Sequence, residues 1–363
     1  MRKRTEDQQP SGLADNDSPP PLPCDRWVAS SALQKAIRRG DAATAARAAT
    51  TLVEQGWARL WRRLLVIAVE DIGVGSVDVC IEVVRLVVEQ KYATSAIRRA
   101  ALYRACNLLA KAPKDRSTDY LIAMAMHDPA LEETRQLCFR ADISERLEYA
   151  VSPDWSLPMR AVAAWYASGI ESWPERRVGR GDFPGLMQRF ADRGAPTELL
   201  EATCVTANKT REPIAVFLPL LWLALTNEPS KVVQTDLPRS GDVDGVPLSA
   251  LDLHTRLGRT ALSIFGSRNA EIAKFLSENL TGFRAVKALR YAAFFADSGA
   301  LQPRLEWCTG KDIERLGIAA DFRSIKVDPA IGKHLIGIVR EHLDELNGIR
   351  AGVFARAKLE GGV

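Results

Sequence analysis

The sequence predicts an all-α protein built from antiparallel helix pairs, and three observations lead to that fold class. Apolar residues recur every three or four positions through most of the chain, which is the spacing of one helix face. Caps and breakers, such as Gly40-Asp41 and Pro113, separate these periodic segments. Strand-like segments are scarce, residues 322–328 ("FRSIKVD") being the best of them, so no parallel sheet is expected.

The first quarter of the chain shows the helical pattern most clearly. Ser30 or Ser31 can cap a first helix that ends before Gly40, and Gly56 closes an Ala-rich second helix. In the next segment, "WARLWRRLLVIAVEDIG", one helix face carries Trp57, Leu60, Trp61, Leu64, Leu65 and Ala68. Further helices are expected over residues 76–90, 96–111 and 118–127.

Changes in composition predict five parts along the chain. Residues 1–25 are rich in Pro, Ser, Asp and Gln and are expected to be a disordered tail. Residues 26–128 form a first helical domain, and residues 129–226 continue the helical pattern as an extension. Prolines and glycines without periodicity predict a loop over residues 227–247, followed by a C-terminal helical domain over residues 248–363.

The composition is that of an ordinary globular protein, since 47% of the 363 residues are hydrophobic and 26% are charged. The longest apolar run, residues 214–225, covers 12 residues, whereas a membrane span needs about 20, so no membrane contact is expected. The N-terminal residues lack the apolar stretch of a secretory signal, and the six cysteines show no CxxC spacing. We therefore expect a cytoplasmic protein with no metal and no other cofactor.

Catalytic signatures are absent from the sequence, which contains no P-loop, no Rossmann glycine motif, no serine-hydrolase elbow and no HExxH. The segment with the most chemical character is "LSALDLHTRLGR", where Asp252 and His254 can orient each other while Arg256 and Arg259 bind phosphate. A metal-dependent nuclease needs more than one carboxylate. A turn whose polar side chains satisfy backbone groups is therefore the favoured interpretation, and no enzyme is expected.

Positive charge is concentrated near the start of the chain. Residues 26–126 hold 16 Lys and Arg against 9 Asp and Glu, a net of +7 in a chain whose total is +4. Paired arginines are most often a solvated helix face, but several pairs presented on one side form a groove for a phosphate backbone. Trp57 and Trp61 lie on the apolar stripe and are predicted to be core. The candidate nucleic-acid-binding residues are Arg38, Arg39, Arg59, Arg62, Arg63, Arg98, Arg99, Lys111, Lys114 and Arg116.

Three segments of this basic region, in their order and spacing, resemble one ATPase family. They are "SALQKAIRRGD" (residues 31–41), "RLLVIAVEDIG" (residues 63–73) and "LLAKAPKDRSTDYLIAMA" (residues 108–125). They are similar to the C-terminal helical part of the replication-associated recombination protein A group, which includes the Mgs proteins and the WRN-helicase-interacting proteins. That group belongs to the clamp-loader branch of the AAA+ ATPases. The resemblance covers about residues 30–126, a little over a quarter of the chain.

The resemblance implies a collar of antiparallel helices that brings subunits together, and hence a homo-oligomer. The family's ATPase module would precede Ser30, where this sequence has only the tail, and its closing segment is not recognisable after Met126. ATP hydrolysis is therefore not expected of this chain. The implied partners are DNA and replication or repair proteins, including a separate ATPase.

The adjacent acids of "VEDIG" receive a structural interpretation. Glu70 and Asp71 end an apolar helix, where a carboxylate faces the negative end of the helix dipole and needs compensation. The expected partners are Lys35, Arg38 or Arg62, or free N–H groups at the start of the next helix. The predicted structural motif comprises Lys35, Glu70, Asp71, Gly73 and Pro113.

These observations predict a non-enzymatic accessory protein of DNA replication, DNA repair or mobile-element maintenance. It would act by self-association and by contact with DNA or with replication partners. Two other hypotheses remain: a scaffold of stacked helix pairs that binds proteins and no nucleic acid, and an enzyme with its site around Asp252, His254 and Arg256. One continuous basic groove would favour the DNA hypothesis, whereas dispersed arginines would favour the scaffold.

Overall fold

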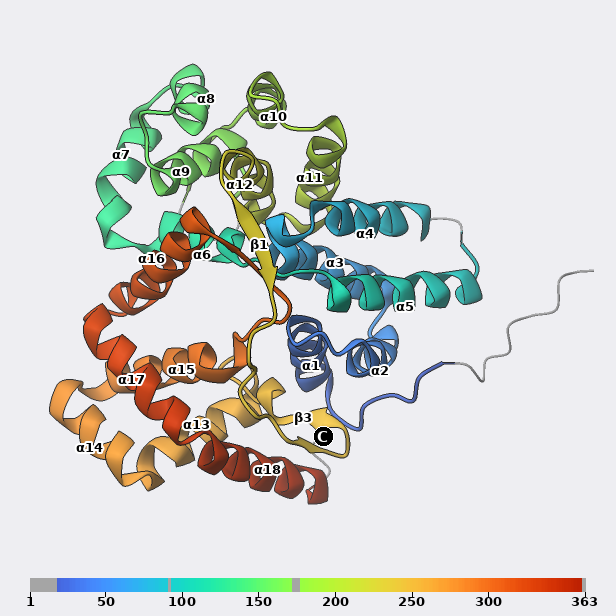
Figure 1. Ribbon diagram of the computed structural model, residues 1–363, viewed down its shortest axis with the longest axis vertical. Helices are drawn as coiled ribbons and strands as arrows, with labels where there is room; N and C mark the ends of the chain where they lie inside the picture. The colour runs from blue at the N-terminus through green and yellow to red at the C-terminus, as the bar shows by residue number, and fades with distance from the viewer. Residues whose placement is uncertain (1–17, 91–92, 172–176, 361–363) are drawn as a thin grey trace, which may run out of the picture.

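The computed structural model describes residues 18–90, 93–171 and 177–360, and helices dominate them, so the chain is all-α as predicted (Figure 1). The α-helices are α1 (Arg26–Arg38), α2 (Ala42–Val53), α3 (Trp57–Ile67), α4 (Val77–Glu89), α5 (Ser95–Lys111), α6 (Ser117–His127), α7 (Glu132–Arg140), α8 (Ile143–Val151), α9 (Leu157–Ser168), α10 (Phe183–Asp192), α11 (Thr197–Thr210), α12 (Phe217–Leu225), α13 (Arg256–Arg268), α14 (Ala270–Asn279), α15 (Gly282–Ala293), α16 (Cys308–Ser324), α17 (Pro329–Glu341) and α18 (Leu343–Leu359).

Shorter elements connect the helices. The strands are β1 (Ser230–Val233), β2 (Asp242–Val243), β3 (Val246–Pro247) and β4 (Arg304–Trp307). The 3₁₀ turns are η3 (Gly73–Gly75), η5 (Pro129–Leu131), η6 (Pro213–Val216) and η7 (Leu248–Ala250), and the π-helices are η2 (Ala68–Ile72) and η8 (Phe294–Ser298). β1 pairs antiparallel with β4, and β2 pairs antiparallel with β3.

The cap predicted for the first helix is wrong, because Ser30 and Ser31 lie inside α1 and the helix begins earlier, after Asp25. The helices expected over residues 76–90, 96–111 and 118–127 are confirmed as α4, α5 and α6, within one residue at each end. The Asp25 side chain caps α1 by accepting hydrogen bonds from the N–H groups of Trp27 and Val28 at 2.7 and 2.8 Å. Asp41 caps α2 in the same way, accepting from the N–H of Thr44 at 2.9 Å.

Three predictions of local structure differ from the observed chain. Residues 1–17 of the predicted tail lie outside the described residues, but Leu22 is buried and its N–H donates to Thr51 of α2 at 2.8 Å. Residues 322–328 are not a strand, since their first three residues end α16. The loop predicted over residues 227–247 contains β1, β2 and β3. The partners of Leu22 and of β1, which are Thr51 and β4, lie far away in the sequence.

The helices gather in three groups (Figure 1). α1 to α5 form the right-hand group, α7 to α12 the upper group and α13 to α18 the lower left, while β1 runs between them. The first apolar core continues through residues 22–257 and includes Trp307 and Phe354, whereas a second core lies within residues 262–346. Because α16 packs along α6, the C-terminal helical region is joined to the first half by side-chain packing.

The same order of elements occurs twice. Two helices, a third helix and a π-helix follow one another as α1, α2, α3 and η2, and again as α13, α14, α15 and η8, which begins 226 residues after η2. The fourth residue of each π-helix is a fully buried aspartate, Asp71 or Asp297, and a glycine stands two positions later. A π-helix adds one residue to a turn, and such turns occur frequently at functional sites.

Candidate functional site

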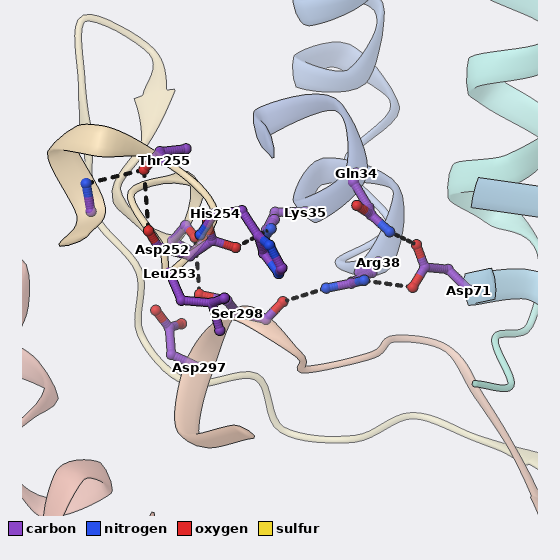
Figure 2. Close-up of polar contacts among 12 residues, drawn as sticks. Gln34, Lys35, Arg38, Asp71, Asp252, Leu253, His254, Thr255, Asp297 and Ser298 are labelled. Carbon is purple, nitrogen blue, oxygen red and sulfur yellow. Dashed lines mark hydrogen bonds and ion pairs between the residues drawn. The ribbon is translucent and has the colours of Figure 1, made fainter. Parts of the chain in front are cut away.

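Arg38, at the end of α1, lies between the two π-helices (Figure 2). Its Nε donates to Asp71 Oδ1 at 2.6 Å and its Nη2 to Glu70 Oε1 at 2.9 Å, both on η2. Its Nη1 donates to the backbone oxygen of Ser298 on η8 at 3.1 Å. Arg38 is 1% exposed, so these acceptors replace the water that its charge has lost.

The Asp71 carboxylate interacts with three side chains. In addition to Arg38, the Gln34 amide donates to its Oδ2 at 2.7 Å, and Arg116 Nε lies 3.2 Å from its Oδ1. Arg38 is thus confirmed as a partner of the acids. Lys35 is not a partner, because its ammonium pairs with Asp252 instead, and Arg62 is exposed.

The start of α6 completes this arrangement. Arg116 pairs with Asp119, and its Nη2 lies 3.5 Å from Glu70 Oε1. The N–H of Asp115 donates to the backbone oxygens of Asp71 and Ile72 at 3.1 and 3.2 Å. The N–H group near the start of the next helix therefore bonds to the carbonyl of Asp71 and not, as expected from the sequence, to its carboxylate. We call the buried cluster of Arg38, Glu70, Asp71, Arg116 and Asp119 the acid–arginine node. Each of the three segments that carry the family resemblance contributes to it.

Two predicted motif residues support the node through close backbone contacts. Gly73 has φ +50°, and a Cβ there would lie 2.7 Å from the backbone oxygen of Asp115, so only glycine fits without strain. Pro113 follows the end of α5, and its carbonyl oxygen lies 2.5 Å from where a Cβ of Gly75 would stand. The chain therefore passes from α5 to α6 directly against the end of η2.

The second π-helix has a matching arrangement. Asp297 accepts from Arg39 Nη2 and from Arg350 Nη1, each at 2.5 Å, and both Asp297 and Arg350 are 0% exposed. Each π-helical aspartate is thus held by one arginine at the C-terminal end of α1 and one arginine from later in the chain. Arg38, the last residue of α1, and Arg39, its C-cap, fix one π-helix each.

The alternative site around Asp252 has a structural role. The carboxylate is 1% exposed, pairs with Lys35 and accepts from the backbone N–H of His254 at 2.9 Å (Figure 2). Burial raises the pKa of Asp252, but the Lys35 ammonium, His254 and the hydrogen bonds to both residues together lower it by more, so the net pKa lies below the ordinary value. Arg256 is exposed, and Arg259 Nη1 contacts the backbone oxygens of Leu253 and His254 at 3.4 and 3.3 Å. These contacts are those of a satisfied turn.

A cavity of about 560 Å³ adjoins the acid–arginine node. Its polar and charged lining residues are Ser30, Ser31, Gln34, Lys35, Arg38, Arg63, Glu70, Arg116, Asp119, His127, Glu212, His254 and Asp321. Its apolar lining residues are Trp27, Val66, Ile122, Ala123, Met126, Ile214, Leu253, Tyr291 and Phe294. This volume and mixed lining are those of a small-molecule pocket.

Two carboxylates of the cavity have strongly raised pKa values. Desolvation and, to a smaller extent, the nearby Asp119 carboxylate together raise the pKa of Asp321 to about 7, against the effect of Arg116. Desolvation also raises the pKa of Asp119 to about 6, opposed by Arg116 and supported by Glu70. Perturbed carboxyl groups in a cavity are typical of functional sites, although structural ion pairs also produce them.

The candidate nucleic-acid residues are divided between interior and surface. Arg38, Lys114 and Arg116 are buried, and Arg39 is bound to Asp297, so these four do not form an exposed groove. The Lys114 ammonium donates to the backbone oxygen of Ala110. The remaining candidates are at least partly exposed: Arg59, Arg62 and Arg63 on α3, and Arg98, Arg99 and Lys111 on α5.

A smaller basic hollow beside Trp27 was not predicted. Trp27 is 63% exposed, and the Arg26 guanidinium lies 4.8 Å from the centre of its ring. Arg59 and Arg63 line the same hollow. Trp27 does not belong to the buried face of α1. A large aromatic residue off the apolar stripe of a helix is the sequence signal that could have indicated this hollow. We call Arg26, Trp27, Arg59 and Arg63 the Trp27 hollow.

Within the described ranges, no group of three or more His, Cys, Asp or Glu residues is placed to hold a metal ion. The described helices include none with the length and apolar character needed to cross a membrane. No family model, curated protein or solved structure matches the chain.

Proposed function

We propose that this chain is a non-enzymatic accessory protein that binds single-stranded nucleic acid through the Trp27 hollow. The observation that carries the proposal is an exposed tryptophan bordered by three arginines, Arg26, Arg59 and Arg63. Proteins that bind single strands combine aromatic side chains, on which bases stack, with cations that follow the phosphates. None of the described residues that line the hollow is acidic, in contrast to the neighbouring cavity.

The clamp-loader resemblance supports a setting for this activity. The three resembling segments meet in one node, through Arg38, Asp71 and Arg116, so they act together as one structural unit. We propose that the unit is a collar-like module working in DNA replication, repair or mobile-element maintenance, as a homo-oligomer or with a separate ATPase.

The test is fluorescence anisotropy with labelled oligothymidylate and with a duplex of equal length, at low and moderate salt. Light scattering on the same samples gives the oligomer mass. We expect the single strand to bind more tightly, with an affinity that falls as salt rises because counterions are released. Trp27→Ala should weaken binding about 5- to 150-fold, which corresponds to the loss of about 1–3 kcal/mol of stacking.

Phe283→Ala is the matched control. Phe283 is 67% exposed and has the Lys287 ammonium 4.6 Å from its ring centre, but it lies on α15, away from the Trp27 hollow. This variant should bind like the wild type. Absence of binding at low salt, or equal losses in the two variants, would refute the proposal and leave the protein-binding scaffold as the better hypothesis.

A further inference from the structure

We propose that the 560 Å³ cavity is a binding site for a small organic cation, an amidinium or ammonium group carried on a planar apolar body. This inference goes beyond nucleic-acid binding, because the residues that carry it, Asp321 and Glu212, do not line the Trp27 hollow.

Three of the four Lys and Arg side chains of the cavity are paired with carboxylates of the chain. Lys35 pairs with Asp252, Arg38 with Glu70 and Asp71, and Arg116 with Glu70, Asp71 and Asp119. The fourth, Arg63, donates to the neutral Gln34 amide oxygen and also lines the Trp27 hollow. At the first three side chains, a bound anion would have to compete with carboxylates that are already in place.

The cavity acids are not all compensated. Among the described residues, the carboxylates of Glu212 and Asp321 have no ion pair or hydrogen bond from a side chain. Desolvation raises the pKa of both, and neighbouring carboxylates, Glu70 for Glu212 and Asp119 for Asp321, add to the effect. The opposing effects of Arg62 on Glu212 and of Arg116 on Asp321 are smaller, so both pKa values remain raised. A ligand cation beside Asp321 would supply the missing positive charge and lower its pKa.

A buried hydroxyl gives independent evidence of an absent partner. Ser31 lines the cavity and is 5% exposed, yet within the described chain its Oγ has no hydrogen-bond partner. A hydroxyl oxygen can accept from a ligand N–H. Arg116 Nη1 also has no hydrogen-bond partner, but that guanidinium lies 5.1 Å from the centre of the Phe294 ring, which stabilises its charge.

The apolar lining defines the rest of the ligand. Ile122, Met126, Tyr291 and Phe294 offer aromatic and aliphatic surface beside the carboxylates. A planar amidinium presents two parallel N–H donors to a carboxylate, as arginine does, while its ring system packs on these side chains. We therefore assign the cavity to aromatic amidines and amines.

The test is isothermal titration calorimetry with three probes of nearly the same shape: benzamidine, benzamide and benzoate. Benzamidine should bind at least 10-fold more tightly than the other two. Asp321→Asn should weaken benzamidine binding at least 10-fold. Asp312→Asn is the matched control and should leave benzamidine affinity unchanged. Asp312 lies on the same helix, but its side chain is 62% exposed and pairs with Arg315 at 3.3 Å.

Preference for benzoate, equal affinity for the three probes, or no benzamidine binding at millimolar concentration would each overturn the inference. The titration contains no nucleic acid and does not change Trp27, so its failure is distinguishable from a failure of the proposed function. Thermal unfolding of Asp321→Asn shows whether a loss of binding reflects the site or a loss of folded protein.

Discussion

Replacing Asp71 with alanine tests the acid–arginine node directly. The substitution removes a carboxylate that is 0% exposed and leaves Arg38 and Arg116, both nearly fully buried, with less negative charge. Removal of one partner from a buried pair costs about 3–5 kcal/mol. The Glu70 carboxylate remains 2.9 Å from Arg38, so the lower half of that range is expected.

The corresponding change in melting temperature follows from chain length. An unfolding entropy of about 2.1 cal/mol/K per residue gives roughly 0.75 kcal/mol/K for the whole chain. Asp71→Ala should therefore lower Tm by about 4–5 °C if the chain unfolds as one unit. Differential scanning calorimetry measures this shift, and urea denaturation gives the free energy of unfolding independently.

Glu148→Ala is the matched control. Glu148 pairs with Arg189 at 2.7 Å, close to the 2.6 Å of the Asp71–Arg38 bond, but its side chain is 53% exposed and that of Arg189 is 38% exposed. An exposed pair contributes at most about 1 kcal/mol, so Tm should fall by about 1 °C or less. Equal shifts in the two variants would show that burial of the node does not stabilise the fold.

Two further substitutions test the surroundings of the node. The raised pKa of Asp321 means that folding favours its protonated form, so the stability it contributes is present below pH 4 and is lost as pH rises through about 7. Asp321→Asn should therefore exceed the wild type in stability by at least about 1 kcal/mol at pH 8 and differ little at pH 4, as measured by urea denaturation at both pH values; no difference at pH 8 would contradict this. Gly73→Ala should cost about 2 kcal/mol more than Gly194→Ala, because both have positive φ but only a Cβ at Gly73 meets backbone, 2.7 Å from the Asp115 oxygen. Equal costs in denaturant melts would refute the clash.

Much of the fold could be predicted because its signals are local. The ranges of α4, α5 and α6 follow from apolar periodicity and from breakers such as Pro113, which act within one or two helical turns. The pairing of Arg38 with the two acids was also accessible, since a carboxylate at a helix end requires a cation. It could not be distinguished from the Lys35 or Arg62 pairings, because the choice depends on the packing of α1 against η2.

The cavity could not be predicted because its parts are distant in the sequence. Asp321 faces the node only because α16 packs along α6, and no feature of residues 308–324 indicates that partner. β1 was missed for a related reason, since its partner β4 begins more than 70 residues later. Residues 63–73 ("RLLVIAVEDIG") and 289–299 ("LRYAAFFADSG") share only the aspartate and the glycine, so the repetition is recognised from the two π-helices and not from the sequence.

The three segments that resemble the ATPase family determine how the interior of this region is held together, and they leave its function open. Within those segments, Arg38, Asp71 and Arg116 bind one another in the interior, so their side chains explain how η2 is held against α1 and α6. A matching pair, Arg39 and Asp297, holds η8 to the same helix. Residues engaged in this way specify a fold and not a reaction. Function is therefore to be sought in groups outside these pairs, and the strongest are the exposed ring of Trp27 and the carboxylate of Asp321, which has no ion pair among the described residues.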